Sequence, residues 1–222
     1  MDEGFKAGQT RKPGLEFSEL VEAREAMHRR YRTIWHVPLV KKQTHVLRRI
    51  LKEGMSVLDV GAGSRGTERR INGLGINVRY KSMDVDRNLG HDFYDLAEVD
   101  ERFDVVLVSQ VIEHVTPPEG LSLLSAVRDK LKEGGLVLVS TPNIFHPNRF
   151  FTTVDHKSFY AYDELAGFLH RAGFEVESAF RVFNDALLQY VLKVYVLHFL
   201  FRFLSIDYAY SIILVGRKVP PP

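Results

Sequence analysis

The glycines Gly61, Gly63 and Gly66 follow an apolar stretch at residues 57–60, in the spacing Gly-x-Gly-x-x-Gly. Because glycine lacks a Cβ, such a loop can bring backbone N–H groups close to a ligand before a helix begins. Asp59 lies two residues before the first glycine, where an acid suits a ligand that carries an amino group. This pattern predicts a strand, a ligand-binding loop and a helix, in that order.

A second acidic position follows at the spacing that nucleoside binding requires. Asp84 comes after the predicted strand 77–83, about 20 residues past the loop, where a carboxylate can accept hydrogen bonds from both hydroxyls of a ribose. Asp86 is the alternative for the same task. A helix or turn cap is the competing role for either residue.

Two segments carry a resemblance to a known family. Residues 57–66 resemble motif I of the class I S-adenosylmethionine-dependent methyltransferases, whereas dinucleotide dehydrogenases with the same glycine spacing usually have an apolar residue in place of Asp59. Residues 103–115, Phe-Asp-Val-Val-Leu-Val-Ser-Gln-Val-Ile-Glu-His-Val, are similar to the fourth strand and following loop of methyltransferase type 11 and type 23 domains. These domains include quinone-biosynthesis-like small-molecule methyltransferases, and the resemblance extends over about residues 54–180 and the last strand.

The resemblance implies S-adenosyl-L-methionine as the cofactor. It assigns cofactor binding to Asp59, Gly61, Ala62, Gly63, Asp84, Asp92, Phe93, Ser109 and Gln110. The glycine loop with Asp59 would hold the amino-acid part of the cofactor, and Asp84 the ribose. Asp92 and Phe93 would hold the adenine, with Asp95 and Leu96 as the alternative pair.

Methyl transfer itself requires mainly an in-line arrangement of nucleophile and methyl carbon. If the acceptor is a hydroxyl, its proton must also leave, and a histidine with a pKa of about 6.5 can accept it. His114 is the first candidate for this base, and His156 and His146 are the next. The alternative is that Glu113 and His114 only orient the loop after the fourth strand.

A metal site is not expected, because Glu113 and His114 are adjacent and cannot point the same way from a regular element. The chain has no cysteine, which excludes thiolate ligands and a thiolate nucleophile. Its formal charge of +2 is spread over many short clusters, so nucleic acid is not indicated as a partner. The rival function is a catalytically inert S-adenosylmethionine-binding scaffold or regulatory subunit, since these motifs concern cofactor binding more than turnover.

These residues need an α/β fold to position them, and the resemblance implies a Rossmann-like, seven-stranded, mostly parallel sheet with helices on both faces and an antiparallel last strand. The expected strands are 55–60, 77–83, a brief one in 91–96, 103–109, 136–141, 174–180 and 208–217. The expected helices are 15–32, 40–51, one from the glycine loop to about Gly73, one from Thr116 to the glycines at 134–135, and 162–172. We expect a mobile tail over residues 1–14, an N-terminal helical cap over 15–53 and the methyltransferase domain over 54–218.

An unusually apolar helical insertion is expected at about residues 184–205. Its most apolar part, 187–204, is too short and too charged to span a bilayer. Its polar residues leave two apolar faces. We expect one face to pack on the sheet edge and the other to contact a lipid surface, a homodimer partner or an apolar acceptor. Burial inside the monomer is the alternative. The acceptor is expected to be a small molecule, a lipid or a glycan that is methylated at oxygen. The absence of an apolar run after the polar start favours a cytoplasmic protein.

Overall fold

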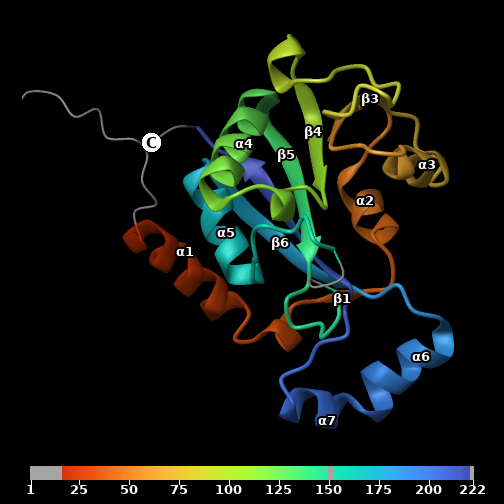
Figure 1. The fold of residues 1–222 in the computed structure, drawn as a ribbon, viewed down its shortest axis with the longest axis vertical. Coiled ribbons are helices and arrows are strands. Elements are labelled where there is room, and N and C mark those ends of the chain that lie inside the picture. The colour runs from red at the N-terminus through yellow and green to blue at the C-terminus, as the bar shows by residue number, and fades with distance from the viewer. Residues whose placement is uncertain (1–16, 150–152, 221–222) are drawn as a thin grey trace, which may run out of the picture.

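The computed structural model describes residues 17–149 and 153–220, and a seven-stranded sheet lies at its centre (Figure 1). The strands are β1 (Leu39–Val40), β2 (Ser56–Val60), β3 (Arg79–Met83), β4 (Phe103–Ser109), β5 (Leu131–Pro142), β6 (Phe174–Val182) and β7 (Ser211–Lys218). Their order in the sheet is β1-β6-β7-β5-β4-β2-β3, with β7 antiparallel to both of its neighbours and every other pair parallel. The Rossmann-like sheet with an antiparallel last strand is therefore confirmed.

Helices cover both faces of this sheet. The helices α1 (Phe17–Arg30), α4 (Pro117–Asp129) and α5 (Tyr162–Arg171) lie on one face, and α2 (Thr44–Ile50) and α3 (Gly66–Asn72) lie on the other (Figure 1). In β4, Val106 and Val108 belong to the core under the first layer, whereas Val105 and Leu107 belong to the core under the second. A central parallel strand is buried on both sides, which explains why β4 is an unbroken apolar run.

The helix α4 begins as its sequence indicates and ends earlier than expected. Thr116 forms a capping box with Glu119, whose carboxylate accepts a 2.8 Å hydrogen bond from the Thr116 N–H. The helix ends at Asp129, and β5 already begins at Leu131. The glycines expected to stop the helix lie in an irregularity of β5, where Gly134 has a φ of +71°.

The N-terminal region contributes one strand to the sheet and one helix to the layer on each face. The expected helix 40–51 begins only at Thr44, because Leu39 and Val40 instead pair with Arg181 and Val182 as the parallel edge strand β1. On the other face, α1 packs against α5, and the Tyr162 hydroxyl donates a 2.8 Å hydrogen bond to the carbonyl of Tyr31 at the end of α1. The expected tail, residues 1–14, lies outside the described residues.

The brief strand expected in 91–96 is absent. This segment makes one isolated bridge, between Phe93 and Met83, and then turns into the 3₁₀ helix η2 (Leu96–Glu98). Asp95 starts that turn by accepting a 2.8 Å hydrogen bond from the Ala97 N–H, and such local bonds compete with a strand ladder. As a consequence, β3 is the edge of the sheet.

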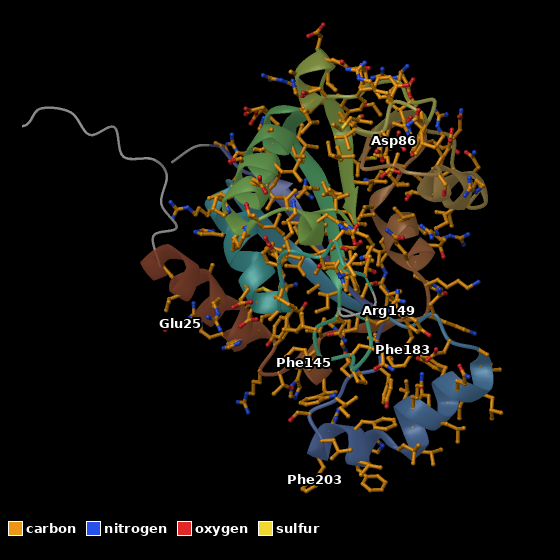
Figure 2. The ribbon with its side chains drawn as sticks, in the orientation of Figure 1. Glu25, Asp86, Phe145, Arg149, Phe183 and Phe203 are labelled. Atoms are coloured by element: carbon orange, nitrogen blue, oxygen red, sulfur yellow. The ribbon has the colours of Figure 1, made fainter. Side chains whose placement is uncertain are left out.

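Residues 187–204 form a protruding helical segment, which we call the strap. It consists of α6 (Leu187–Val191), the π-helical turn η4 (Leu192–Val196) and α7 (His198–Phe203), and it lies beyond the end of the sheet where β1 is found (Figure 1). Phe201 packs on Tyr208 with ring centroids 4.7 Å apart, whereas Phe203 is 85% exposed and points away from the body (Figure 2). Among the described residues, no helix is both long and apolar enough to cross a membrane.

Candidate active site

A cleft of about 520 Å³ opens at the carboxyl ends of β2 and β4. From β2 the chain continues to β3 on one side, while β4 flanks β2 on the other side, so this is the switch point at which open α/β sheets bind ligands. Of the residues predicted to bind the cofactor, Gly61, Ala62, Ser109 and Gln110 line the cleft. The predicted loop and the end of β4 thus meet at one site.

The glycine loop is held to the tip of β3. The N–H groups of Gly61 and Ala62 both donate to the carbonyl of Met83, at 2.8 and 3.1 Å. Gly61 has a φ of +72°, and a Cβ placed on it would lie 2.3 Å from Cγ2 of Val111. Glycine is therefore required at this position both by the backbone conformation and by the close approach of the segment after β4.

Asp84 fastens the next part of the loop. Its carboxylate accepts one hydrogen bond from the Gly63 N–H at 2.8 Å and another from the Asp86 N–H at 3.0 Å. A carboxylate has about four acceptor sites, so two remain for a ligand. The side chain of Asp86 instead accepts from the backbone and side chain of Asn88, within its own turn.

Asp59 lies beneath the loop, where only 1% of its surface is exposed. Its Oδ2 accepts a 2.7 Å hydrogen bond from the Tyr80 hydroxyl, while Oδ1 has no hydrogen-bond partner in the described part of the chain. Burial raises the pKa of the Asp59 carboxyl to about 6. A cationic group of a ligand at the loop would favour the ionised form of this acid.

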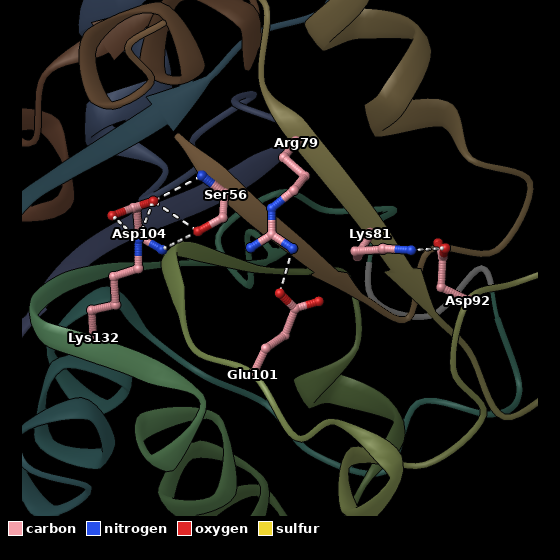
Figure 3. Close-up of polar contacts among 7 residues, drawn as sticks. All are labelled: Ser56, Arg79, Lys81, Asp92, Glu101, Asp104 and Lys132. Carbon is pink, nitrogen blue, oxygen red and sulfur yellow. Dashed lines mark hydrogen bonds and ion pairs between the residues drawn. The ribbon is translucent and has the colours of Figure 1, made fainter. Parts of the chain in front are cut away.

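Asp92 clamps the segment after β3 (Figure 3). Its Oδ1 accepts from Lys81 Nζ at 2.8 Å, and its Oδ2 accepts from the N–H and Oγ of Ser82 at 2.9 and 3.0 Å. Partial burial by itself would raise the pKa of this carboxyl, but these hydrogen bonds lower it. Asp92 thus already has a structural task, and Phe93 beside it packs on the core; neither residue lines the cleft.

Similar polar contacts hold the opposite end of these strands, away from the cleft (Figure 3). Asp104 accepts hydrogen bonds from the N–H and Oγ of Ser56, at 2.8 and 2.7 Å, and from Lys132 Nζ. Arg79 forms an ion pair with Glu101 at the edge strand. These contacts fix β2 between its neighbours and hence the point from which the glycine loop departs.

Ser109 and Gln110 connect β4 to its surroundings. Gln110 has a φ of +57°, and both its N–H and its Nε2 donate to Ser140 of β5, at 3.0 and 3.1 Å. Ser109 Oγ accepts from Gln43 Nε2 at 3.1 Å, and Gln43 Oε1 accepts from Arg70 at 3.3 Å. This chain of contacts joins β4, α2 and α3 across one wall of the cleft.

The cleft also has a charge that the sequence patterns did not indicate. Lys42, Arg70 and Arg149 line it, and among the described residues no acidic side chain does. Three cations at neutral pH attract an anionic group such as the carboxylate of an amino acid. Sequence reasoning missed Gln43 and Arg70 because they belong to no motif and meet only through the packing of α2 and α3.

A second polar cluster follows β4. Glu113 and His114 lie in the 3₁₀ turn η3 (Ile112–His114), and the ring of His156 is 4.9 Å from that of His114, centroid to centroid. His114 Nδ1 lies 3.0 Å from Oδ2 of Asp155. One nitrogen or oxygen atom from each of Glu113, His114 and His156 lies within 4.8 Å of the other two. The expectation that two adjacent residues cannot converge is wrong here, because the turn is not a regular strand or α-helix.

Glu113 is the buried member of this cluster, with 1% of its surface exposed and, among the described residues, no well-formed hydrogen bond to either carboxylate oxygen. Burial raises the pKa of its carboxyl to about 7, its own backbone N–H and the Thr141 side chain oppose that rise, and the neighbouring Asp155 adds to it. His146 lies elsewhere, between the rings of Tyr208 and Tyr210, each 5.4 Å away. The structure therefore brings His114 and His156 together and separates His146 from them.

Comparison with known families gives one match over most of the chain. Residues 26–179 match a family described as a methyltransferase domain. The matched region begins in α1 and ends in β6, so it contains the glycine loop, Asp84 and the His114 cluster.

Among curated proteins, this chain is similar to a ubiquinone biosynthesis O-methyltransferase of Cereibacter sphaeroides strain ATCC 17025, with 33% identity over 153 residues. The match covers 61% of this chain, and the chain spans 60% of the length of that relative.

Solved structures share the fold. A SAM-dependent methyltransferase from Archaeoglobus fulgidus has a TM-score of 0.62 at 20% identity, covering 79% of this chain and 92% of that one. The 1,6-didemethyltoxoflavin-N1-methyltransferase of Burkholderia thailandensis, solved with S-adenosylhomocysteine, has a TM-score of 0.57 at 18% identity and covers 96% of this chain and 94% of that one. At such identities the likeness shows the fold and does not select the acceptor.

Proposed function

The chain belongs to the methyltransferase-domain family, and on that premise we propose that it transfers a methyl group from S-adenosylmethionine to an oxygen atom of a small-molecule acceptor. The observation that carries this proposal is that the glycine loop, which Asp84 holds through the Gly63 N–H, meets Gln110 at the switch point of the sheet, where Gly61 and Gln110 line the 520 Å³ cleft. Fold likeness alone would not suffice, since one fold can host many reactions.

The residues of the site fit the chemical groups of this cofactor. At Gly63 a Cβ would meet no atom within 4 Å, so the backbone of the loop is open to a ligand there, whereas Val111 closes the space beside Gly61. The unpartnered Oδ1 of Asp59 lies under the loop and provides negative charge for an ammonium group, while the cationic wall of the cleft suits a carboxylate. Asp84 retains acceptor sites for ribose hydroxyls. For the adenine, Asp92 and Phe93 stay the proposed pair, although Asp92 already accepts from Lys81 and Ser82.

The oxygen acceptor is inferred from the relatives named as O-methyltransferases, which share 39% identity over 105 residues and 52% over 48 residues. The sulfonium of the cofactor supplies both the methyl group and a good leaving group. The chain must align the acceptor and remove its proton, and we assign this second task to His114 and His156. His114 follows the carboxyl end of β4, the edge at which the cleft opens, and His156 lies beside it, although neither ring lines the cleft; Asp155 orients His114.

The strap carries a group of exposed aromatic side chains. Tyr195, Phe199 and Phe203 are 65%, 66% and 85% exposed, so burial inside the monomer does not account for them. Such a group of exposed apolar side chains is typical of an interaction site. We infer that the strap contacts a lipid surface, a second copy of the chain or a lipid-like acceptor.

The experiment that tests the function has two parts. Calorimetry with S-adenosylmethionine, S-adenosylhomocysteine and NAD should give micromolar-range binding of the first two ligands and none of the third. Release of S-adenosylhomocysteine is then measured with a panel of phenolic acceptors, each paired with its O-methylated product as a control. Tighter binding of NAD would exclude the cofactor assignment. Cofactor binding without turnover on any hydroxylated acceptor would favour the inert scaffold instead.

A further inference from the structure

We propose that Glu113, His114 and His156 bind a divalent transition-metal ion. Each offers one ligand atom, and the three atoms lie within 4.8 Å of one another. Ligands around a single ion are at most about 4 Å apart, given metal–ligand distances of ~2.0–2.2 Å, so small side-chain rotations would close the set. Two imidazoles and one carboxylate are a common protein ligand set for such ions.

The strongest single observation is the state of Glu113. Its side chain is 1% exposed, and among the described residues neither carboxylate oxygen makes a well-formed hydrogen bond, although Thr141 is a polar neighbour. A buried carboxylate without partners is unfavourable, and buried charges in proteins are usually paired or coordinate a metal. A cation between this carboxylate and the two imidazoles would supply the missing partner.

The backbone around Glu113 is already fixed by contacts that do not involve its side chain. The N–H groups of Lys157 and Ser158 donate to the carbonyl of Glu113 at 2.7 and 3.1 Å. The turn η3 and the segment that carries His156 are therefore held together by their backbones. A site built on two such segments requires little rearrangement to bind an ion.

Asp155 supplies the outer support that histidine ligands usually have. Its Oδ2 lies 3.0 Å from His114 Nδ1, which leaves Nε2 of that ring for the metal. A carboxylate that accepts from the second ring nitrogen fixes the tautomer and makes the imidazole a better ligand.

The ligand set also selects the class of ion. Imidazole nitrogens suit Zn²⁺, Co²⁺ and Mn²⁺, whereas Mg²⁺ prefers oxygen ligands and retains its water. Three protein ligands leave at least one position open, as in catalytic metal sites. This inference rests on the proposed function and changes the part of the two histidines in it. With an ion bound they would hold the ion, and an acceptor hydroxyl in the open position would lose its proton more readily because a bound cation lowers the pKa of an oxygen ligand.

The test begins with binding of the metal alone. Tag-free, chelator-treated protein is titrated with Co²⁺, followed by visible absorption, and with Zn²⁺, followed by calorimetry. We expect one ion per chain and a rise in melting temperature on loading. Glu113→Gln and His156→Ala should each weaken Zn²⁺ binding at least 10-fold, since second-shell changes alone cost 10–100-fold. His170→Ala, an exposed histidine at the end of α5, is the matched control and should bind like wild type.

Equal Zn²⁺ affinity in wild type, Glu113→Gln and His156→Ala would overturn the proposal, as would a wild type that binds no ion. If Glu113→Gln fails to fold, Asp155→Asn replaces it and should weaken binding less than His156→Ala does. Binding of S-adenosylhomocysteine is measured on the same samples. A wild type that binds S-adenosylhomocysteine but no metal ion refutes only this inference, whereas a wild type that binds the ion but no S-adenosylhomocysteine refutes only the proposed function.

Discussion

The hydroxyl of Tyr80 donates a 2.7 Å hydrogen bond to Oδ2 of Asp59, while Oδ1 of the same carboxylate remains unpartnered beneath the glycine loop. The two residues lie on neighbouring strands, β3 and β2. Burial and the nearby Asp59 both raise the pKa of Tyr80, so its hydroxyl stays protonated and remains a donor. Asp59 is thus held by Tyr80 through Oδ2, while Oδ1 is left to interact with a cationic group of a ligand at the loop.

The first prediction concerns stability and pH. The pKa of Asp59 is about 6 in the folded protein against an ordinary value of 3.8, so the folded state binds more protons between these values. Its contribution to stability is present below pH 4 and is lost as the pH rises through 6. Asp59→Asn should therefore gain stability relative to wild type over this range, by at most about 3 kcal/mol. Urea unfolding at pH 4 to 8 measures it, and a constant difference would contradict the prediction.

The second prediction concerns Asp84. Replacing it with Ala would remove the charge-assisted hydrogen bonds that we assign to the ribose, and it releases the Gly63 N–H from its 2.8 Å contact. The variant should lose a few kcal/mol of S-adenosylhomocysteine binding free energy, measured by calorimetry. Asp86→Ala is the control, because that side chain bonds only within its own turn, to Asn88. Equal losses in the two variants would refute the assignment of Asp84.

The third prediction concerns the proton of the acceptor. His114→Ala should lower turnover by ~10²–10⁴ and leave cofactor affinity within a factor of a few, whether His114 acts as a base or as a metal ligand. His146→Ala serves as the comparison, because this histidine lies against Tyr208 and Tyr210 and apart from the cluster. Unchanged turnover in His114→Ala would mean that alignment alone suffices.

Local patterns in the sequence predicted much of this fold. The glycine loop, the apolar run of β4 and the capping box at Thr116 are each contained in a few consecutive residues, and all three were located correctly. The strand β1 was missed because two residues carry no periodicity and pair with β6, which lies more than 130 residues further along the chain. The brief strand expected in 91–96 was wrong because the side chain of Asp95 starts a turn there.

In the candidate site, too, the local features were predictable from the sequence and the long-range contacts were not. Asp84 could be inferred from its spacing after the loop, and it does bond to that loop. The Arg70, Gln43 and Ser109 contacts join three separate elements, so no local pattern signals them. The convergence of Glu113 with His156 depends on the path of the chain after β5 and on backbone hydrogen bonds to Glu113.

The last prediction concerns the strap. Its outward side carries Tyr195, Phe199 and Phe203, while Lys193 on the inner side forms a 2.9 Å ion pair with Asp185. Because Phe201 packs on Tyr208, the strap is anchored to the body and its outward side chains can be changed without removing that contact. The triple replacement of the three aromatic residues by Ser should therefore leave the fold and cofactor affinity unchanged.

The same variant should associate more weakly, either with vesicles of anionic phospholipid or with a second copy of itself. Co-sedimentation measures vesicle binding, and analytical ultracentrifugation measures dimerisation. The free energy lost should scale with apolar area, at about 25 cal/mol per Å² removed from contact. Leu89→Ser, an exposed apolar residue far from the strap in the chain, is the control and should behave like wild type. A wild type that is monomeric and ignores vesicles, or a triple variant that associates as strongly as wild type, would exclude a surface role and leave the strap only as a wall for an apolar acceptor.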